Sequence, residues 1–225
     1  MAIAVLYEDK DVLVICKPSG MLSEASEREA SVVTALLSEG GCETPPAPIT
    51  RLDREVSGVM MLAKTKEGAA FYSAQMSDRT LFRKEYLALV SGRLDEQEGR
   101  MQDLLFKDSF KNKSYVVKRM RRGVKAASLS YRVIAEAQAN GTPVSLLHIT
   151  LETGRTHQIR VQCSSRRHPL LGDGRYGGDP SYPMGLLSYR LSFRAKDGKT
   201  HSVCLPYPQN EPFSIFDAQT VQKSL

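Results

Sequence analysis

One short apolar segment constrains the fold more than any other part of the chain. Val59 to Ala63 is an unbroken apolar run that follows a charged segment, Thr50 to Gly58, and ends at Lys64. A run this short and uniform is typical of a strand buried on both faces, although a buried helical turn has the same pattern. We therefore expect a polar loop fixed to a central strand, an arrangement that often presents reactive side chains.

The composition describes an ordinary globular chain with a local concentration of positive charge. The 225 residues are 41% hydrophobic and 25% charged, with a net charge of +6, which suits one domain, residues 1–225, with a sizeable core. Between Lys107 and Lys125, here called the basic window, there are eight basic residues and one acid, Asp108. The window carries +7 and the rest of the chain −1, which indicates a polyanionic partner.

The basic window permits two interpretations. The plain one is a solvated hairpin that turns near Gly123, and the other is a surface for a polyanion. Phe110 and Tyr115 lie among the charges, and they could stack on bases or serve equally well as strand residues facing a core. The candidate polyanion-binding residues of the window are Lys118, Arg119, Arg121 and Arg122.

The sequence has no metal-binding motif, and its one match to a dinucleotide-binding motif lies in the wrong structural context. The four cysteines and four histidines show none of the spacings of a metal site, so we expect no metal and no cofactor. The stretch Gly172–Gly177 matches the dinucleotide-binding pattern in letters only, because it does not leave a strand and open a helix. The apolar start, Ala2–Leu6, is too short for a signal peptide, and no run suits a membrane span. We expect a cytoplasmic protein with reduced thiols, present as a monomer.

Strand patterns outnumber helix patterns along the chain. The expected strands are 12–15 (followed by a turn at 17–20), 59–63, 82–91, 128–136, 144–152, 186–194 and 200–205, and the hairpin dipeptide Asn140-Gly141 lies in a slightly longer connection between the fourth and fifth of them. The expected helices are 31–38 with Ser31 as its N-cap, 66–79 with an alanine-rich face (Ala69, Ala70, Ala74), and one that begins at Thr156 as its N-cap. This order predicts an α+β fold with a mixed, mainly antiparallel central sheet flanked by helices. Residues 206–225 are expected to form a peripheral tail.

Several separated segments resemble the motifs of one enzyme family, and they occur in the family's order. Arg51-Leu52-Asp53-Arg54-Glu55-Val56-Ser57-Gly58, followed by the apolar run and Ala63-Lys64, resembles the signature of RluA-type RNA pseudouridine synthases. The resemblance covers about residues 5–205. The other segments that carry it are 7–20, which resembles the opening strand and turn, 84–90 and 153–161, which resemble the second and third motifs, and 169–178, which resembles the loop that follows.

The resemblance implies a pseudouridine synthase fold and the isomerisation of specific uridines in ribosomal or transfer RNA to pseudouridine, without a cofactor. It makes Asp53 the catalytic nucleophile. Cleavage of the uracil C–N bond gives the sugar oxocarbenium character, which a carboxylate can trap or stabilise. The resemblance also implies that Arg160 pairs with Asp53 and keeps it ionised, and that Tyr86 stacks against the uracil and assists proton loss from C5.

The resemblance further assigns residues that handle the RNA. The target uridine must leave its stack, and Arg51 is expected to fill the gap, because a guanidinium stacks and hydrogen-bonds well. His157 lies three residues before Arg160 and would contact the RNA backbone from the same helix face, although a plain histidine at a helix start fits equally well. Arg155 is a further candidate RNA-binding residue.

The sequence also permits other interpretations of these residues, and it departs from the family pattern at several positions. Judged without the resemblance, Asp53 reads as part of a surface ion pair and Tyr86 as a core tyrosine. One alternative function is a non-catalytic RNA-binding or chaperone protein on the same fold, and another is a nucleoside- or glycoside-cleaving hydrolase built on Asp53 and Glu55. The departures, none of which removes a proposed catalytic residue, are Thr50, Gln162 and Ser188 where the family commonly has histidine, and Val56 where it has threonine.

Overall fold

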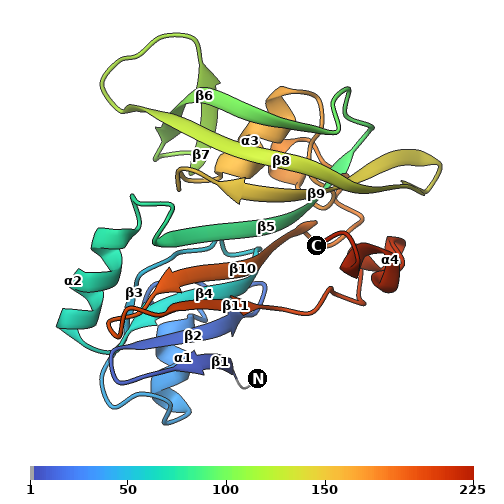
Figure 1. Ribbon diagram of the computed structural model, residues 1–225. Coiled ribbons are helices and arrows are strands. Elements are labelled where there is room, and N and C mark those ends of the chain that lie inside the picture. The colour runs from blue at the N-terminus through green and yellow to red at the C-terminus, as the bar shows by residue number, and fades with distance from the viewer. Residues whose placement is uncertain (1–2) are drawn as a thin grey trace. The chain divides into compact units, whose positions relative to one another are not determined.

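The computed structural model describes residues 3–225, which form two compact units (Figure 1). The first unit runs to Lys84 and also includes Leu187–Leu205. The second unit comprises Glu85–Leu186 and Pro206–Leu225. The expectation of one catalytic domain over residues 1–225 stays a prediction.

The sheet of the first unit mixes antiparallel and parallel pairs. Its order is β1-β2-β4-β10, with β11 paired to β10 and β3 paired to β4. β2 runs antiparallel to β1 and β4, whereas β4 and β10 pair in parallel through Ser57–Leu187 and Gly58–Ser188. The strands are β1 (Ala4–Glu8), β2 (Val12–Lys17), β3 (Ala47–Pro48), β4 (Ser57–Ala63), β10 (Leu186–Arg194) and β11 (Thr200–Cys204).

β4 is buried on both faces, as its apolar run predicted. Val59 and Met61 pack on one side of the strand in a cluster that includes Tyr72 and Phe193. Because successive side chains of a strand alternate, Met60 and Leu62 point to the other side, where they are fully buried as well. Each buried side chain of this size contributes about 1.5–3 kcal/mol, so β4 anchors the loop that precedes it.

Two helices accompany this sheet. α1 (Val32–Ser38) begins as predicted, because the Ser31 hydroxyl accepts a hydrogen bond from Thr34 N at 3.1 Å and so caps the helix. α2 (Lys66–Gln75) is capped in the same way by Thr65, and it ends four residues earlier than expected. Its buried face is Gly68, Tyr72 and Gln75 rather than the expected alanine-rich face.

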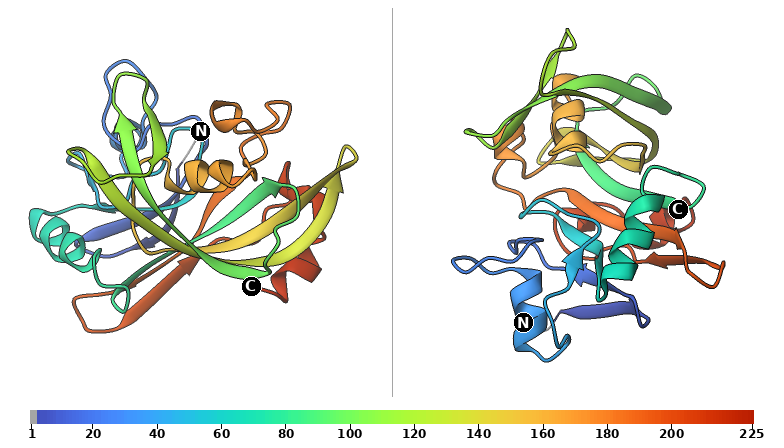
Figure 2. Two further views of the ribbon diagram at one scale, coloured as in Figure 1. Left: turned by 90° about the horizontal axis from the view of Figure 1, so that it is seen from above. Right: turned by 90° about the vertical axis from the view of Figure 1, so that its left-hand side faces the viewer.

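The strand order of the second unit is β5-β9-β8-β6-β7, and the pairs β9–β8, β8–β6 and β6–β7 are antiparallel. A tight turn at Asn140-Gly141, both with positive φ, joins β8 to β9 and is shorter than the predicted connection; it is the usual two-residue hairpin turn. Figure 2 shows α3 lying against the curved strands of this sheet. The elements are β5 (Phe82–Ser91), β6 (Glu98–Asp108), β7 (Lys113–Val117), β8 (Val124–Ala139), β9 (Thr142–Leu151), α3 (Gln158–Ser165) and the 3-10 helix η1 (Gly174–Tyr176).

The basic window does not form the hairpin that was predicted around Gly123. β7 pairs with β6, and β6 pairs on its other side with β8. The hairpin therefore turns at residues 109–112, whereas the turn at Gly123 joins two strands that lie on opposite sides of β6. The sequence did not indicate this arrangement because β6 carries many polar residues and was not recognised as a strand.

The expectation that residues 206–225 form a peripheral tail is wrong. Phe213, Phe216 and Val221 are buried, and the Tyr207 hydroxyl donates to Phe213 O at 2.8 Å. Arg132 of β8 donates to Ser224 O at 2.7 Å. The segment folds into η2 (Phe213–Ile215) and α4 (Ala218–Gln222) and belongs to the second unit.

The predicted fold class is confirmed in both units. Strands outnumber helices in residues 3–225, and the parallel pairing of β4 with β10 occurs beside antiparallel pairs, so the arrangement of the strands is mixed. Of the helices described, none has the length and apolar character that crossing a membrane would require.

Gly58 gives a direct test of the parallel pairing between β4 and β10. Its φ is 121°, and a Cβ at this position would lie 2.2 Å from Ser188 O, whereas Gly198 has φ 80° and no atom within 4 Å. We expect Gly198→Ala to lower the free energy of unfolding by about 1–2 kcal/mol through backbone strain alone. Gly58→Ala should cost clearly more in urea unfolding, because the two backbones must separate. Equal costs would contradict the close approach.

Candidate functional site

The loop that carries Asp53 is held on both sides of that residue. The Ser23 hydroxyl donates to Leu52 O at 2.7 Å and accepts from Leu52 N at 3.0 Å. On the other side, Gly20 N donates to Arg54 O at 2.8 Å. Val56 N donates to Asp53 O at 3.1 Å and closes the turn into β4. The half-buried Asp53 is therefore presented by a backbone with little freedom, as a catalytic group requires.

Lys17 is the central support of this loop, and the sequence analysis assigned it no more than a place in a turn. Its side chain is fully buried at the end of β2, and Nζ donates to Pro18 O at 2.8 Å, Met21 O at 2.7 Å and Arg54 O at 3.0 Å. Burial lowers the pKa of Lys17 to about 8, although the carboxylates of Asp53 and Glu55 act in the opposite direction. A lysine that ends an apolar strand directly before Pro-Ser-Gly was the signal available in the sequence.

The arginines that flank Asp53 are exposed. Arg51 Nη1 lies 2.9 Å from Glu24 Oε1 and Arg54 Nη1 lies 2.6 Å from Glu29 Oε2, with more than two fifths of each of these side chains exposed. Exposed ion pairs contribute only about 0–1 kcal/mol, so the Arg51 guanidinium can exchange Glu24 for another partner at little cost.

Tyr86 and Arg160 both lie in the second unit, whereas Asp53 lies in the first. Tyr86 is buried in β5 and Arg160 is buried in the first turns of α3. Arg160 forms a bidentate ion pair with Asp173, with Nε 2.6 Å from Oδ2 and Nη2 2.8 Å from Oδ1. The expected pairing of Arg160 with Asp53 stays a prediction.

Asp173 is a site residue that the sequence analysis missed. It lies inside the glycine-rich stretch Gly172–Gly177, which forms the single turn η1 and no longer helix. The stretch folds into a compact loop in which Gly178 N donates to Asp173 O at 2.9 Å and Asp173 N donates to Leu170 O at 3.2 Å. The fully buried Asp173 carboxylate pairs with Arg160. The glycine-rich stretch therefore forms the compact loop that positions this carboxylate.

The start of α3 differs from the prediction. The helix begins at Gln158, and its N-cap is His157 with a left-handed φ of 53° and no capping side-chain bond, so Thr156 is not the N-cap. Gln158 shapes this turn, because its Oε1 accepts from Arg155 N and from the Thr153 hydroxyl. His157 therefore precedes the helix and does not share a helix face with Arg160.

His157 is a buried support at this point of the chain. Its Nδ1 lies 2.9 Å from the Tyr176 hydroxyl, which also accepts from Ser114 N at 2.8 Å. The Tyr176 ring lies 5.3 Å from the Arg160 guanidinium carbon. These contacts give His157 a structural role, and its expected contact with the RNA backbone stays a prediction.

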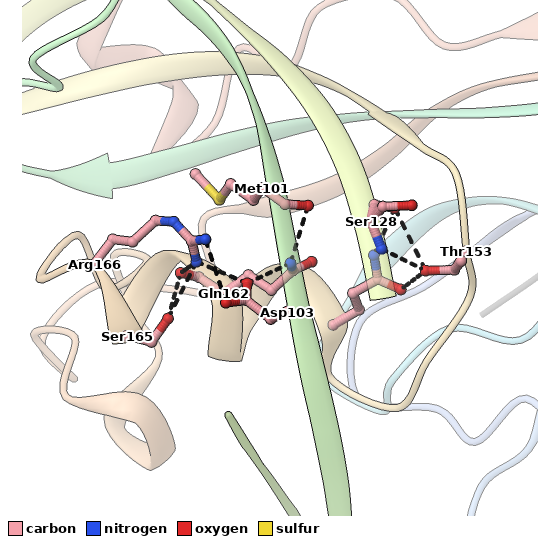
Figure 3. A network of polar contacts seen from close by, with 8 residues as sticks. Met101, Asp103, Ser128, Thr153, Gln162, Ser165 and Arg166 are labelled. Carbon is pink, nitrogen blue, oxygen red and sulfur yellow. Dashed lines mark hydrogen bonds and ion pairs between the residues drawn. The ribbon is translucent and has the colours of Figure 1, made fainter. Parts of the chain in front are cut away.

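A polar network fixes the rest of α3 to the sheet (Figure 3). Gln162 Nε2 donates to Asp103 Oδ2 at 2.7 Å and to Met101 O at 3.3 Å, and Arg166 Nη1 donates to the same carboxylate oxygen at 2.8 Å. Gln162, one of the departures from the family pattern, thus ties α3 to β6 directly.

The other departures also have defined contacts. The Thr50 hydroxyl accepts from Met61 N at 2.9 Å, and the Ser188 hydroxyl donates to Val59 O at 2.9 Å. Val56 is buried at the turn that follows Asp53. Thr50, Val56 and Ser188 therefore fit the Asp53 loop and its strand without leaving a polar group of their own unsupported.

The basic window is exposed. Arg121 lies over the Phe106 ring at 5.1 Å, and Arg155 donates from Nε to Ala126 O at 3.0 Å. Phe110 is 98% exposed, so the interpretation that it faces a core is wrong, and Tyr115 is 36% exposed. The exposed basic side chains of the loop between β7 and β8 are Lys118, Arg119, Arg121 and Arg122.

The residues described offer no obvious metal centre. Among residues 3–225, no group of three or more His, Cys, Asp or Glu side chains is arranged to hold a metal ion.

Comparison with known proteins identifies the family. The family model of RNA pseudouridylate synthase matches residues 11–165. Ribosomal large subunit pseudouridine synthase D of Zymomonas mobilis is 34% identical over 227 residues, which cover 97% of this chain and 69% of that protein. Dual-specificity RNA pseudouridine synthase RluA of Yersinia pestis is 34% identical over 209 residues, covering 91% of this chain and 93% of that protein. The chain belongs to the RNA pseudouridylate synthase family, and its resemblance to RluA-type members is confirmed.

Length and fold add two further findings. The chain spans about half the length of several curated relatives, such as 54% of pseudouridine synthase D of Yersinia pestis, which is 36% identical over 186 residues. The solved structure of human RNA pseudouridylate synthase domain containing 1 matches with a TM-score of 0.75 at 23% identity, over 92% of this chain and 85% of that one. Human RNA pseudouridylate synthase domain containing 4 matches with a TM-score of 0.74 at 21% identity, over 97% and 93%. The predicted pseudouridine synthase fold is thus confirmed.

The buried ammonium of Lys17 predicts a pH dependence of stability. Burial lowers its pKa from 10.5 to about 8, so between these values the folded protein releases a proton that the unfolded chain still binds. The free energy of unfolding should therefore rise with pH over this range, by up to about 3 kcal/mol relative to Lys17→Met. Urea titrations of both proteins from pH 7 to 10.5 measure the difference. Parallel pH profiles would contradict the buried cation.

The Arg160–Asp173 pair predicts a large loss of stability when its carboxylate is neutralised. Removing one partner of a buried ion pair typically costs about 3–5 kcal/mol, and we expect Asp173→Asn to lower the free energy of unfolding by about 3 kcal/mol. Asp179→Asn is the matched control, because Asp179 lies in the same loop but is exposed. It should leave the urea midpoint nearly unchanged. A similar effect of both substitutions would argue against a special role for Asp173.

Proposed function

We propose that the protein is an RNA pseudouridine synthase, an isomerase that converts specific uridines of ribosomal or transfer RNA to pseudouridine. The observation that carries this proposal is the Asp53 loop. It has the family's Arg-Leu-Asp motif, and Leu52 and Arg54, the neighbours of Asp53, are each hydrogen-bonded to the segment 17–23. We propose that both units together constitute one catalytic domain, acting in the cytoplasm.

In this proposal Asp53 attacks or stabilises the ribose as the C–N bond to uracil breaks. The developing oxocarbenium ion is positive, so an ionised carboxylate stabilises it. The uracil then turns and rejoins the ribose through C5, and the C5 proton is lost. Tyr86 stacks against the base and assists this proton loss, and Arg160, oriented by Asp173, supports the ionised form of Asp53.

The proposed RNA contacts are exposed cations, with the buried His157 as the exception. Arg51 replaces the flipped uridine in its stack, which its weakly held pair with Glu24 allows. Arg155 and His157 are proposed contacts near the start of α3. The loop between β7 and β8 is proposed to bind phosphates, because its positive side chains are exposed and neutralise a polyanion at low cost; they are Lys118, Arg119, Arg121 and Arg122.

The test follows tritium released from C5 of uridine in bulk cellular RNA, taken from cells that lack this gene. The wild-type protein should release tritium, and Asp53→Asn should lower the release by at least about a thousandfold, because it removes the nucleophile. Binding of the same RNA to Asp53→Asn should persist. Release by Asp53→Asn at the wild-type rate would refute the proposed role of Asp53.

Glu55→Gln is the matched control, because Glu55 is an exposed carboxylate in the same loop. It should retain tritium release, and free uracil should appear with none of the proteins. Release of free uracil would instead support a hydrolase. RNA binding by the wild-type protein without any tritium release would support the non-catalytic RNA-binding function.

A further inference from the structure

The turn between β6 and β7 exposes a phenylalanine almost completely. Phe110 is 98% exposed, so its ring contributes nothing to the apolar core. Among residues 3–225, the large hydrophobic side chains that are exposed are Val5, Phe110, Tyr115, Val116 and Met120. All but Val5 lie in the basic window. Apolar side chains gathered on one exposed segment indicate an interaction surface.

The backbone of this turn is braced from several sides. Asp108 Oδ1 accepts from Lys111 N at 3.0 Å. Arg175 Nη1 donates to Asn112 O at 2.9 Å, and Lys113 Nζ donates in return to Arg175 O at 2.6 Å. None of these bonds involves the Phe110 side chain, so the turn fixes the backbone that carries the ring, and the ring itself takes no part in folding.

The charge around Phe110 identifies the kind of partner. Lys107, Lys111 and Lys113 lie within three residues of Phe110 along the chain, and Arg175 is bonded to the same turn. The single acid of the window, Asp108, is occupied in capping the turn. A flat apolar ring among cations suits a polynucleotide, which offers phosphates and base faces together.

The braced turn is also fixed to the segment that precedes α3. Ser114 N donates to the Tyr176 hydroxyl at 2.8 Å, and the Ser114 hydroxyl donates to Thr156 O at 2.7 Å. Lys113 Nζ lies 5.0 Å from the centre of the Tyr176 ring, and Arg160 lies over the same ring. A nucleotide held at Phe110 would thus have a defined position relative to Arg160 within the second unit.

We propose that Phe110 stacks on an unpaired base of the RNA, separate from the uridine that reacts, while Lys111 neutralises a neighbouring phosphate. This inference rests on the proposed function and specifies its substrate as RNA that carries an unpaired nucleotide in addition to the target uridine. The bases of a double helix are stacked on one another, so a double helix could offer a phosphate to Lys111 but no free base face to Phe110.

A binding experiment tests the stacking directly. The probe is a ten-nucleotide oligouridylate with one central 2-aminopurine, whose fluorescence is quenched when the base stacks. The wild-type protein and Phe110→Trp should quench the probe. Phe110→Ala should not quench it and should bind about tenfold more weakly, as expected for the loss of one base–aromatic contact. Equal quenching and affinity in Phe110→Ala and the wild type would overturn the proposal.

Salt dependence separates stacking from damage to the turn. Phe110→Ala removes no charge, so the slope of log K against log salt should stay at the wild-type value, whereas Lys111→Gln should reduce the slope by about 0.7. The urea midpoint of Phe110→Ala should not move, since the ring is exposed. Val5→Ala, which removes an exposed apolar side chain outside the basic window, should bind like the wild type. A changed slope in Phe110→Ala would overturn the stacking role.

Turnover distinguishes this inference from the proposed function. With structured bulk RNA, Phe110→Ala should raise KM for tritium release and leave kcat unchanged. If the wild type releases tritium and Phe110→Ala has the same KM, the stacking site is refuted and the proposed isomerase activity is retained. Quenching that depends on Phe110, in a protein that releases no tritium, would refute the isomerase and retain the RNA site. If Phe110→Ala binds RNA like the wild type but loses binding to a protein, the ring contacts a protein partner and the proposal is refuted.

Discussion

The site in the first unit depends on one buried ammonium group. Lys17 satisfies three backbone carbonyls that come from two segments, its own turn and the Asp53 loop. A buried cation is expensive unless it is hydrogen-bonded, so the sequence has to supply these carbonyls in one place. The lowered pKa of Lys17 records the cost of its burial. In return, the position of Asp53 is coupled to β2 and β4, the most deeply buried strands of this unit.

In the second unit the supporting group is a buried anion, whereas in the first unit it is a buried cation. There a buried carboxylate, Asp173, orients a buried guanidinium, Arg160, through two hydrogen bonds with little freedom of geometry. Such fork-to-fork pairs fix direction as well as distance. The supporting contacts of α3 through Gln162 and Arg166 converge on Asp103 of β6. Arg160 is therefore oriented by a residue outside α3, just as the Asp53 loop is held by Lys17 of β2.

Local patterns predicted much of the fold and less of the site. The apolar run of β4, the Ser31 cap of α1 and the Asn140-Gly141 turn are short-range signals, and the structure has all three. β6 was not predicted, because its sequence is mostly polar with an apolar run of only three residues, and pairing with both β7 and β8 stabilises it. The partners of Lys17 and Asp173 could not be assigned from sequence, because Arg54 and Arg160 lie 37 and 13 residues away along the chain. The resemblance to the family located Asp53, Tyr86 and Arg160, whereas the contacts that support Arg160 and the Asp53 loop required the structure.

The position of β7 at the end of the strand order has a consequence for solubility. A strand at the edge of a sheet offers unpaired backbone groups to other chains, and β7 also exposes Tyr115 and Val116. Proteins commonly protect such edges with lysines, whose charge repels a second copy of the same strand. Lys111 and Lys113 at one end of β7 and Lys118 at the other are in this position. The same cations that favour a polyanionic partner thus also discourage pairing of β7 with a second copy of the chain.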